Sequence, residues 1–290
     1  MMLPFPPLAG DALQGKGLVG LYEKALPAEW PWEQRLTSAA EVGYRYLEIS
    51  MDETDGRLAR LEDDGEQRSI RRAIENSGMP LLTMCLSAHR RFPLGSADRA
   101  IRERGYAIMR RAIDFSVYTG VRIVQVNGYD VYYEPHTDDT VKRFIEGLRR
   151  ATEWAGQAGV MLALENTDVP VSAALHDGMK LVAEIDSPWF QMYPDMANVA
   201  AEGYDPCAEL AVCAGHLVAV HVKDGRPKVV RGVPFGRGIV PFEDVFRTLR
   251  GIGFCGPMTV EMWAEYSQDP LQAACEARQF VQNLLEKTYV

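Results

Sequence analysis

Short apolar segments alternate along the chain with longer segments of helical periodicity. Eight segments of five to seven residues are apolar or rich in β-branched residues, which predicts strands. They cover residues 18–22, 46–50, 81–87, 122–127, 161–165, 190–195, 217–223 and 257–261. Each is followed by a segment in which apolar residues recur at the spacing of one helix face.

The helical segments have well-marked ends. The clearest has its apolar residues on one face, namely Val141, Phe144, Ile145, Leu148, Ala151 and Ala155. A second lies near the C-terminus, with Ala273, Ala277, Phe280, Val281 and Leu284. Glycines at 43, 78, 120, 159, 215 and 253 come just before the next strand, where helix C-terminal stops are expected.

Eight uninterrupted strand–helix units favour a closed parallel barrel over an open doubly wound sheet. The phosphate-loop pattern G-x-x-x-x-G-K-[ST] is absent, and no G-x-G-x-x-G follows the first strand. The length of 290 residues suits one such barrel. We therefore predict an α/β fold, a (β/α)8 TIM barrel, as a single domain over residues 1–290, with a loose N-terminal tail at about residues 1–16.

Charge and composition exclude several function classes. The net charge of −9, with no basic block, argues against a nucleic-acid partner. The longest apolar runs are too short to cross a bilayer, and no basic residue precedes Lys16 as a secretory signal would require. The five scattered cysteines form no C-x-x-C pair and read as reduced thiols. We expect a cytoplasmic protein with no membrane partner.

Four consecutive strands each carry a residue of metal-ligand type at or near the carboxyl end. They are Glu165, Asp195, His221 and Glu261. In a barrel the carboxyl ends of the strands meet on one face, where catalytic residues lie. Two Glu, one Asp and one His form an oxygen-rich set that suits Mn, Mg, Co or Zn. One such residue is unremarkable, but four at the same level predict a divalent-metal site, because isolated buried charges are costly.

Sequence motifs throughout the chain resemble one known family, the L-ribulose-5-phosphate 3-epimerases (L-xylulose-5-phosphate 3-epimerases) of the xylose-isomerase-like barrels. The motifs are GLYEKALP (20–27), LEISMDETD (47–55), MCLSAHRRFPLGS (84–96), GYDVYYE (128–134), WFQMYPDMAN (189–198), HVKD (221–224), VPFGRG (233–238) and CGPMTVEMW (255–263). They occur in the expected order. The chain departs from the family pattern at Asn127, at Asn166–Thr167 and at Arg237, which leaves the four metal-type residues intact.

The resemblance implies a carbohydrate epimerase (EC 5.1.3 type) that interconverts L-xylulose 5-phosphate and L-ribulose 5-phosphate through a metal-stabilised enediolate. It implies one divalent metal ion on the same four residues, with Glu165 and Glu261 as the two acid–base groups. It also suggests substrate contacts from Asn198 and Arg226. At the level of the cell and the assembly, it suggests pentose metabolism, such as L-ascorbate degradation, and a homodimer or larger homo-oligomer.

Basic residues at the starts of loops on the predicted active face suit the substrate phosphate. The candidates are Lys24, His89, Arg90, Arg91, Lys223 and Arg226. Surface ion pairing is the alternative for Arg90 and Arg91. Glu23, at the end of the first strand, is a candidate for accepting a hydrogen bond from a sugar hydroxyl.

Other functions remain open on the same barrel. One group comprises other sugar or sugar-phosphate isomerases, other ketose 3-epimerases and polyol dehydratases. Another is a non-catalytic sugar-binding barrel, against which the complete set of four ligand-type residues argues.

Overall fold

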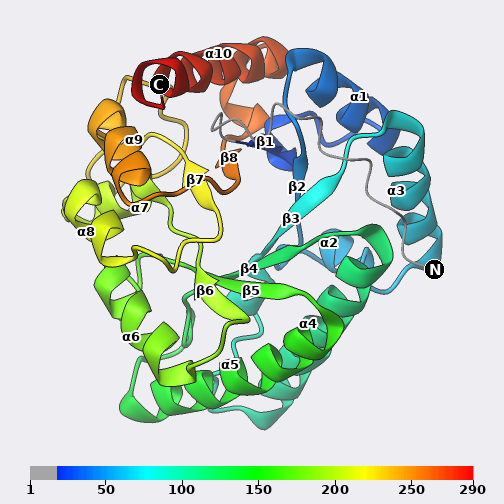
Figure 1. Ribbon diagram of the computed structural model, residues 1–290. Helices are drawn as coiled ribbons and strands as arrows, with labels where there is room; N and C mark the ends of the chain where they lie inside the picture. The colour runs from blue at the N-terminus through cyan, green and yellow to red at the C-terminus, as the bar shows by residue number, and fades with distance from the viewer. Residues whose placement is uncertain (1–17, 290) are drawn as a thin grey trace.

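Eight parallel strands lie inside a ring of helices (Figure 1). The computed structural model describes residues 18–289, so the tail predicted at about residues 1–16 lies outside the described part. The strands are β1 (Val19–Tyr22), β2 (Leu47–Ser50), β3 (Leu81–Leu86), β4 (Ile123–Asn127), β5 (Met161–Glu165), β6 (Phe190–Met192), β7 (Val220–Val222) and β8 (Met258–Val260). The predicted TIM-barrel fold class is confirmed.

The sheet order is β6-β5-β4-β3-β2-β1-β8-β7, and all of the pairings are parallel. Its two ends meet through isolated parallel bridges, Met192 with Leu217 and Asp195 with His221. The backbone N–H of His221 donates to the Pro194 carbonyl at 2.9 Å. Asp195 and His221 are both candidate metal ligands, so closure of the barrel brings two of the four together.

The observed strands match the prediction closely from β1 to β5 and are shorter than predicted from β6 to β8. Residues 161–165 were predicted as a strand, and β5 has the same bounds. In contrast, β6 ends at Met192, three residues before the predicted end. Pro194 lacks an N–H and cannot continue a ladder, which explains the early end. Asp195 is therefore on a short extension beyond the strand.

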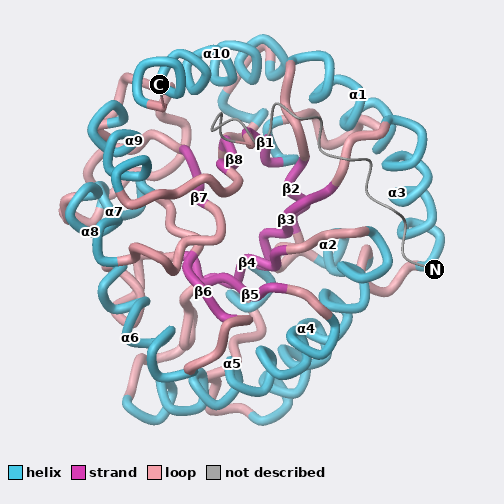
Figure 2. Tube along the Cα trace, in the orientation of Figure 1, coloured by secondary structure: helices cyan, strands magenta, loops and turns pink. Residues whose placement is uncertain are grey.

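The helices form a continuous outer ring (Figure 2). They are α1 (Trp32–Val42), α2 (Asp55–Ala59), α3 (Asp64–Ser77), α4 (Arg99–Thr119), α5 (Asp138–Ala158), α6 (Leu175–Ile185), α7 (Met196–Ala201), α8 (Pro206–Val212), α9 (Phe242–Gly251) and α10 (Pro270–Thr288), with 3-10 turns η2 (Glu23–Ala25), η3 (Ser87–Arg90) and η4 (Ala264–Tyr266). Contacts run from α1 through α3, α4, α5, α6, α8 and α9 to α10, which returns to α1.

Four of the six predicted glycine stops are confirmed as helix C-caps, whereas Gly215 and Gly253 follow the C-caps Cys213 and Ile252 of α8 and α9. Gly43, Gly78, Gly120 and Gly159 are the C-caps of α1, α3, α4 and α5, each in the left-handed conformation. A side chain is strained there, whereas glycine has no Cβ to clash. These four glycines thus end their helices just before the next strand.

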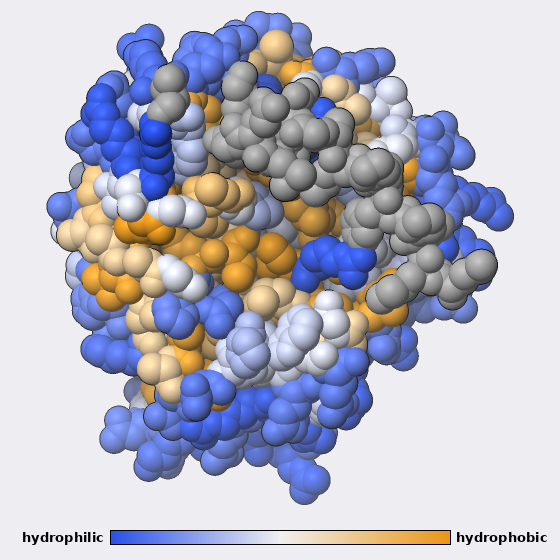
Figure 3. All heavy atoms as spheres, viewed as in Figure 1, coloured by the Kyte–Doolittle hydropathy of each residue, from blue (hydrophilic) through white to orange (hydrophobic). Residues whose placement is uncertain are grey.

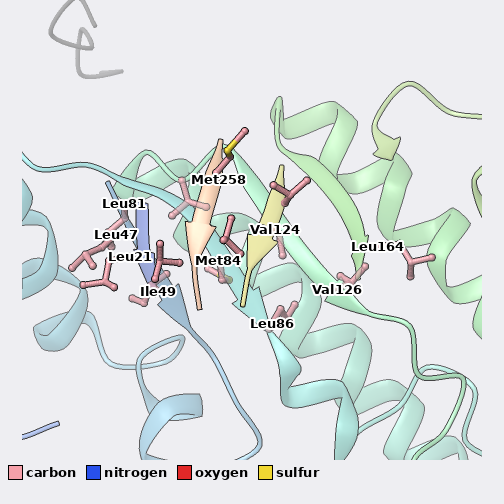
Figure 4. Packing of buried hydrophobic residues seen from close by; sticks show 14 of the residues in the cluster. Leu21, Leu47, Ile49, Leu81, Met84, Leu86, Val124, Val126, Leu164 and Met258 are labelled. Carbon is pink, nitrogen blue, oxygen red and sulfur yellow. The ribbon is translucent and has the colours of Figure 1, made fainter. Parts of the chain in front are cut away.

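The main hydrophobic core lies between the strands and the helices. Figure 4 shows side chains of this core, such as Leu47 and Ile49 on β2 and Val124 and Val126 on β4. Successive strand residues point to opposite faces, so the residues between them, such as Glu48 and Gln125, point into the barrel. Both are fully buried. The inside of the barrel is therefore partly polar.

Hydrophilic residues surround the face of the molecule seen in Figure 3, and hydrophobic residues gather towards its middle. Within residues 18–289, none of the helices has the length and apolar character needed to cross a membrane.

Candidate active site

A cavity of about 740 Å³ lies over the carboxyl ends of the strands. Its lining includes Tyr22, Asn127, Glu165 and Glu261, which come from β1, β4, β5 and the end of β8. Loops after β2, β3 and β7 contribute further polar residues. This is the face where barrel enzymes carry their catalytic residues.

The four predicted ligand residues form one cluster. One ligand atom from each of Glu165, Asp195, His221 and Glu261 can be chosen so that all lie within 4.8 Å of one another, and all four residues are buried. His221 Nδ1 lies 2.9 Å from Glu165 Oε1, 3.7 Å from Glu261 Oε2 and 3.9 Å from Asp195 Oδ2. The spacing suits four ligands around a single cation.

Glu165 is held in place by side-chain amides from the neighbouring strand. The amide groups of Gln125 and Asn127 both donate hydrogen bonds to its Oε2. Both residues are on β4, which pairs with β5. With Oε2 fixed in this way, Oε1 faces His221.

Asp195 is fixed by the start of α7. Its Oδ1 accepts hydrogen bonds from the backbone N–H groups of Ala197 and Asn198, as an N-cap side chain does. The side-chain amide of Asn166 donates a hydrogen bond to the backbone carbonyl of Asp195 and accepts one from its backbone N–H. These contacts leave Oδ2 directed at the cluster, with Lys223 Nζ at 2.5 Å.

Negative charge is in excess around the cluster. The carboxylates are Glu48, Glu165, Asp195 and Glu261, and the cationic groups that reach them are Lys223 and His221. Asp195 Oδ2 and Glu261 Oε2 are buried without a hydrogen-bond partner, although Lys223 Nζ is close to both. Buried charge of one sign is unstable without compensation. The residues therefore fit a divalent cation.

The pKa values reflect this crowding. Burial raises the pKa of Glu165 to about 7, and the charges of Glu261 and Asp195 act in the same direction. Burial also favours the neutral form of Glu261, but Lys223 and His221 outweigh it and hold its pKa at about 2. Two glutamates of the same cluster thus differ widely in proton affinity, as groups that exchange protons with a substrate often do.

Four of the predicted substrate-binding residues line the cavity: Lys24, Arg90, Asn198 and Lys223. Arg90 donates to the Tyr129 hydroxyl at 2.8 Å and stacks on Tyr132. Lys223 is drawn to the carboxylates and donates to Asn198 Oδ1 at 3.1 Å. Lys24 pairs with Asp52 at 2.6 Å. These four positions are compatible with substrate contacts.

The other four predicted substrate-binding residues, Glu23, His89, Arg91 and Arg226, lie outside the cavity lining. Arg91 forms the surface ion pair given as its alternative, with Asp55 at 2.8 Å. Glu23 turns outward in η2 and is enclosed by three arginines, Arg35, Arg57 and Arg60. His89 is buried beside α4, 3.2 Å from the Gly105 carbonyl, and burial lowers its pKa to about 4. Arg226 is exposed, with a carbonyl contact at 3.4 Å. A position near a strand end predicts the level of a residue along the barrel axis, but it does not predict the direction in which the side chain points.

Trp263 lies just beyond Glu261 in the sequence, a place that suits a wall of the pocket, and it lines the cavity. Its ring lies 4.9 Å from the guanidinium carbon of Arg231 and 5.6 Å from Lys223 Nζ. Sequence reasoning missed Lys228, which also lines the cavity and pairs with Glu202. Beneath the cavity, Glu48 contacts His221. A carboxylate in the middle of an apolar strand was the available signal for Glu48.

Comparison with known proteins agrees with this geometry. The family model of the xylose isomerase-like TIM barrel matches residues 36–284. L-ribulose-5-phosphate 3-epimerase UlaE of Escherichia coli K12 is 46% identical over 270 residues, covering 93% of this chain and 95% of the relative. The same enzyme of Escherichia fergusonii is also 46% identical, with the same coverage. The chain belongs to the L-ribulose-5-phosphate 3-epimerase family. The predictions of this family and of a carbohydrate epimerase are confirmed.

Solved structures share the fold of this family member at low sequence identity. A structure of L-ribulose 3-epimerase has a TM-score of 0.76 and 20% identity, covering 93% of this chain and 95% of that chain. A D-allulose 3-epimerase from Methylomonas sp. has a TM-score of 0.77 and 18% identity, covering 98% and 100%. At these identities the likeness concerns the fold alone.

Proposed function

We propose that this protein is a metal-dependent 3-epimerase that interconverts L-xylulose 5-phosphate and L-ribulose 5-phosphate. The observation that carries the proposal is the buried cluster of Glu165, Asp195, His221 and Glu261 beneath the cavity. The substrate follows from the UlaE relatives, whose name specifies L-ribulose 5-phosphate and position 3.

The four clustered residues would hold one divalent cation, and their oxygen-rich set with one imidazole suits Mn, Mg, Co or Zn. When bound, the cation acts as a Lewis acid that polarises the substrate C2 carbonyl and stabilises the negative charge developing during proton removal. The protein side chains form the cavity, orient the sugar and carry the protons.

Epimerisation at C3 needs proton transfer on both faces of the sugar. The C3 proton is weakly acidic because it lies next to the C2 carbonyl, and one carboxylate removes it while the C–H electron pair enters an enediolate. A carboxylic acid on the opposite face then protonates C3 and restores the C2 carbonyl. We assign these roles to Glu165 and Glu261, which exchange roles with the direction of reaction. Their strands, β5 and β8, are separated around the barrel by β6 and β7.

Side chains above the cluster would orient the sugar. Asn198 donates to the Asn166 carbonyl at 2.9 Å and accepts from Lys223, so its amide is fixed at the cavity wall. Arg90 is fixed by Tyr129 on another side of the cavity. Such pre-positioned polar groups favour one substrate orientation without an ordering cost at binding.

For the phosphate, we assign Arg231, a residue that the sequence did not single out. Lys24, Lys223 and Lys228 also line the cavity, but each is within 2.8 Å of a carboxylate oxygen. Arg90, a fourth cationic residue of the lining, lies 3.9 Å from a carboxylate oxygen of Glu53 and is tied to Tyr129. Within residues 18–289, Arg231 has no carboxylate partner. It lies over Trp263, whose ring also contacts Lys223 beside the carboxylates. This placement suits a phosphate carried two carbons beyond C3.

The test is turnover of L-xylulose 5-phosphate by the purified protein, before and after treatment with a chelator. We expect L-ribulose 5-phosphate as product, loss of turnover with the chelator, and recovery when a divalent cation is restored. An aldose as product would indicate C1–C2 isomerisation instead, and loss of water would indicate a dehydratase. No reaction despite cation binding would indicate a sugar-binding barrel.

A further inference from the structure

Glu48 is a fully buried carboxylate that lies beneath the cluster of four candidate metal ligands and does not line the cavity. It belongs to β2, between Leu47 and Ile49, which pack in the outer core (Figure 4). Its Oε1 lies 2.7 Å from His221 Nε2. Because β2 and β7 are not neighbours in the sheet, this contact crosses the inside of the barrel.

Hydrogen bonds from hydroxyl groups fix the other oxygen of Glu48. Thr83 Oγ1 and the Tyr193 hydroxyl each donate to Oε2 at 2.7 Å. Because a phenol has one proton, the contact between Tyr193 and Thr259 requires Thr259 to donate. By the same reasoning Tyr46 donates to Thr259 at 2.8 Å. The chain of hydroxyl groups therefore has one direction, and it ends on Glu48.

The backbone of the barrel makes room for this series of hydroxyl groups. A Cβ added at Gly20 of β1 would lie 2.2 Å from the ring of Tyr46, so only glycine leaves room for that ring. The Tyr46 and Tyr193 side chains are both fully buried. The direction of the hydroxyl groups thus follows from fixed side chains.

We propose that Glu48 is a positioning residue that keeps the ring proton of His221 on Nε2 and thereby presents Nδ1 to the divalent cation. With both hydroxyl donors on Oε2, Oε1 is the acceptor for the His221 N–H. Nδ1 is then the ring nitrogen that faces Glu165, Glu261 and Asp195, at 2.9, 3.7 and 3.9 Å. This inference rests on the proposed metal-dependent function, because it concerns the same cluster.

The effect of replacing Glu48 follows from the donor count. In Glu48→Gln, the two hydroxyl donors hold the amide oxygen at the position of Oε2. The amide NH2 group then faces His221 Nε2, which has to become an acceptor, so the ring proton moves to Nδ1. A proton on Nδ1 competes with the cation. Hydrogen-bond partners of metal-ligating histidines typically contribute ~10–100-fold to metal affinity.

The experiment measures Zn²⁺ binding by the full chain and the state of the His221 ring, without substrate. In wild-type protein with ¹⁵N-labelled histidine and bound Zn²⁺, we expect NMR to show coordination through Nδ1 and a proton on Nε2. Calorimetric titration should show that Glu48→Gln binds Zn²⁺ ~10–100-fold more weakly than wild type. Glu75→Gln, which alters an exposed carboxylate paired with Arg71, should bind like wild type.

The possible results distinguish a failure of the role given to Glu48 from a failure of the proposed epimerase function. Coordination through Nε2 in the wild type, or wild-type Zn²⁺ affinity in a folded Glu48→Gln, overturns the role of Glu48 and leaves the epimerase proposal standing. Failure of the wild type to bind any divalent cation overturns both. Because the ring measurement uses the wild type, it decides the question even where Glu48→Gln does not fold.

Discussion

Lys223 Nζ lies 2.5 Å from Asp195 Oδ2 inside the buried cluster. The same ammonium is 2.8 Å from Glu261 Oε2, so one lysine contacts two of the four candidate metal ligands. It neutralises part of the negative charge that the cluster carries without a cation. Asp195 and Glu261 in turn raise the pKa of Lys223, against the effect of burial, so it remains charged.

Removing this ammonium should make the fold depend more strongly on the metal. In Lys223→Met, two buried carboxylates lose their cation, and breaking such a pair costs about 3–5 kcal/mol. We expect a lower unfolding temperature for the metal-free variant than for metal-free wild type, and a larger rise on adding Zn²⁺. Thermal unfolding of both proteins with and without the ion measures this. Equal metal-free stabilities would contradict the role given to Lys223.

Metal binding should depend on pH through Glu165. Burial raises its pKa to about 7 in the metal-free protein, so near neutral pH it is partly protonated. A cation binds the ionised form of Glu165 and the neutral form of His221, whose pKa the neighbouring carboxylates raise well above its usual value, so it displaces protons from both. We therefore expect affinity to fall with decreasing pH, and to fall more steeply below about 7, with proton release seen by calorimetry in buffers of different ionisation enthalpy. An affinity whose pH dependence does not steepen below about 7 would contradict the pKa of Glu165.

Arg231→Ala should weaken recognition of the phosphate and leave the chemistry intact. A hydrogen bond to a charged group contributes about 1.5–3 kcal/mol, so KM for L-ribulose 5-phosphate should rise ~10–100-fold with little change in kcat. Values for unphosphorylated L-ribulose should not change. Arg91→Ala is the matched control, because Arg91 pairs with Asp55 and does not line the cavity. Equal losses on both sugars would exclude Arg231 as the phosphate ligand.

His89 should give the stability of the fold a distinct pH dependence. Its pKa is lowered from 6.5 to about 4 by burial, so the unfolded chain binds the proton more readily between these values. Stability should therefore decrease as the pH falls from 6.5 towards 4, by about 3 kcal/mol from this residue. Denaturant unfolding across this range should show a weaker pH dependence for His89→Gln, whose amide can still donate to Gly105. Parallel curves for variant and wild type would contradict a neutral buried His89.

Much of the fold follows from the sequence because the signals are local. Residues 161–165 form β5 as predicted, and the glycine stops occupy left-handed positions. The end of β6 was placed too late although Pro194 was a local signal for it. The bounds of β7 were placed less well because the switch to isolated bridges depends on barrel closure, which local pattern does not contain.

The candidate site was predicted in part for similar reasons. Glu165, Asp195, His221 and Glu261 could be found because the carboxyl ends of parallel strands must meet. The direction of Glu23 depends on arginines from α1 and from the α2 region, which only the folded chain brings together. Glu48 was overlooked because it lies within a strand, below the level that the strand ends define.

Proton exchange at C3 by Glu165 and Glu261 is tested most directly by NMR of L-ribulose 5-phosphate incubated with the metal-loaded enzyme in D₂O. We expect deuterium at C3 of both epimers with the wild type, and no net epimerisation with either Glu165→Gln or Glu261→Gln. Deuterium at C1 in place of C3, or wild-type turnover by Glu261→Gln, would contradict the two-carboxylate 3-epimerase.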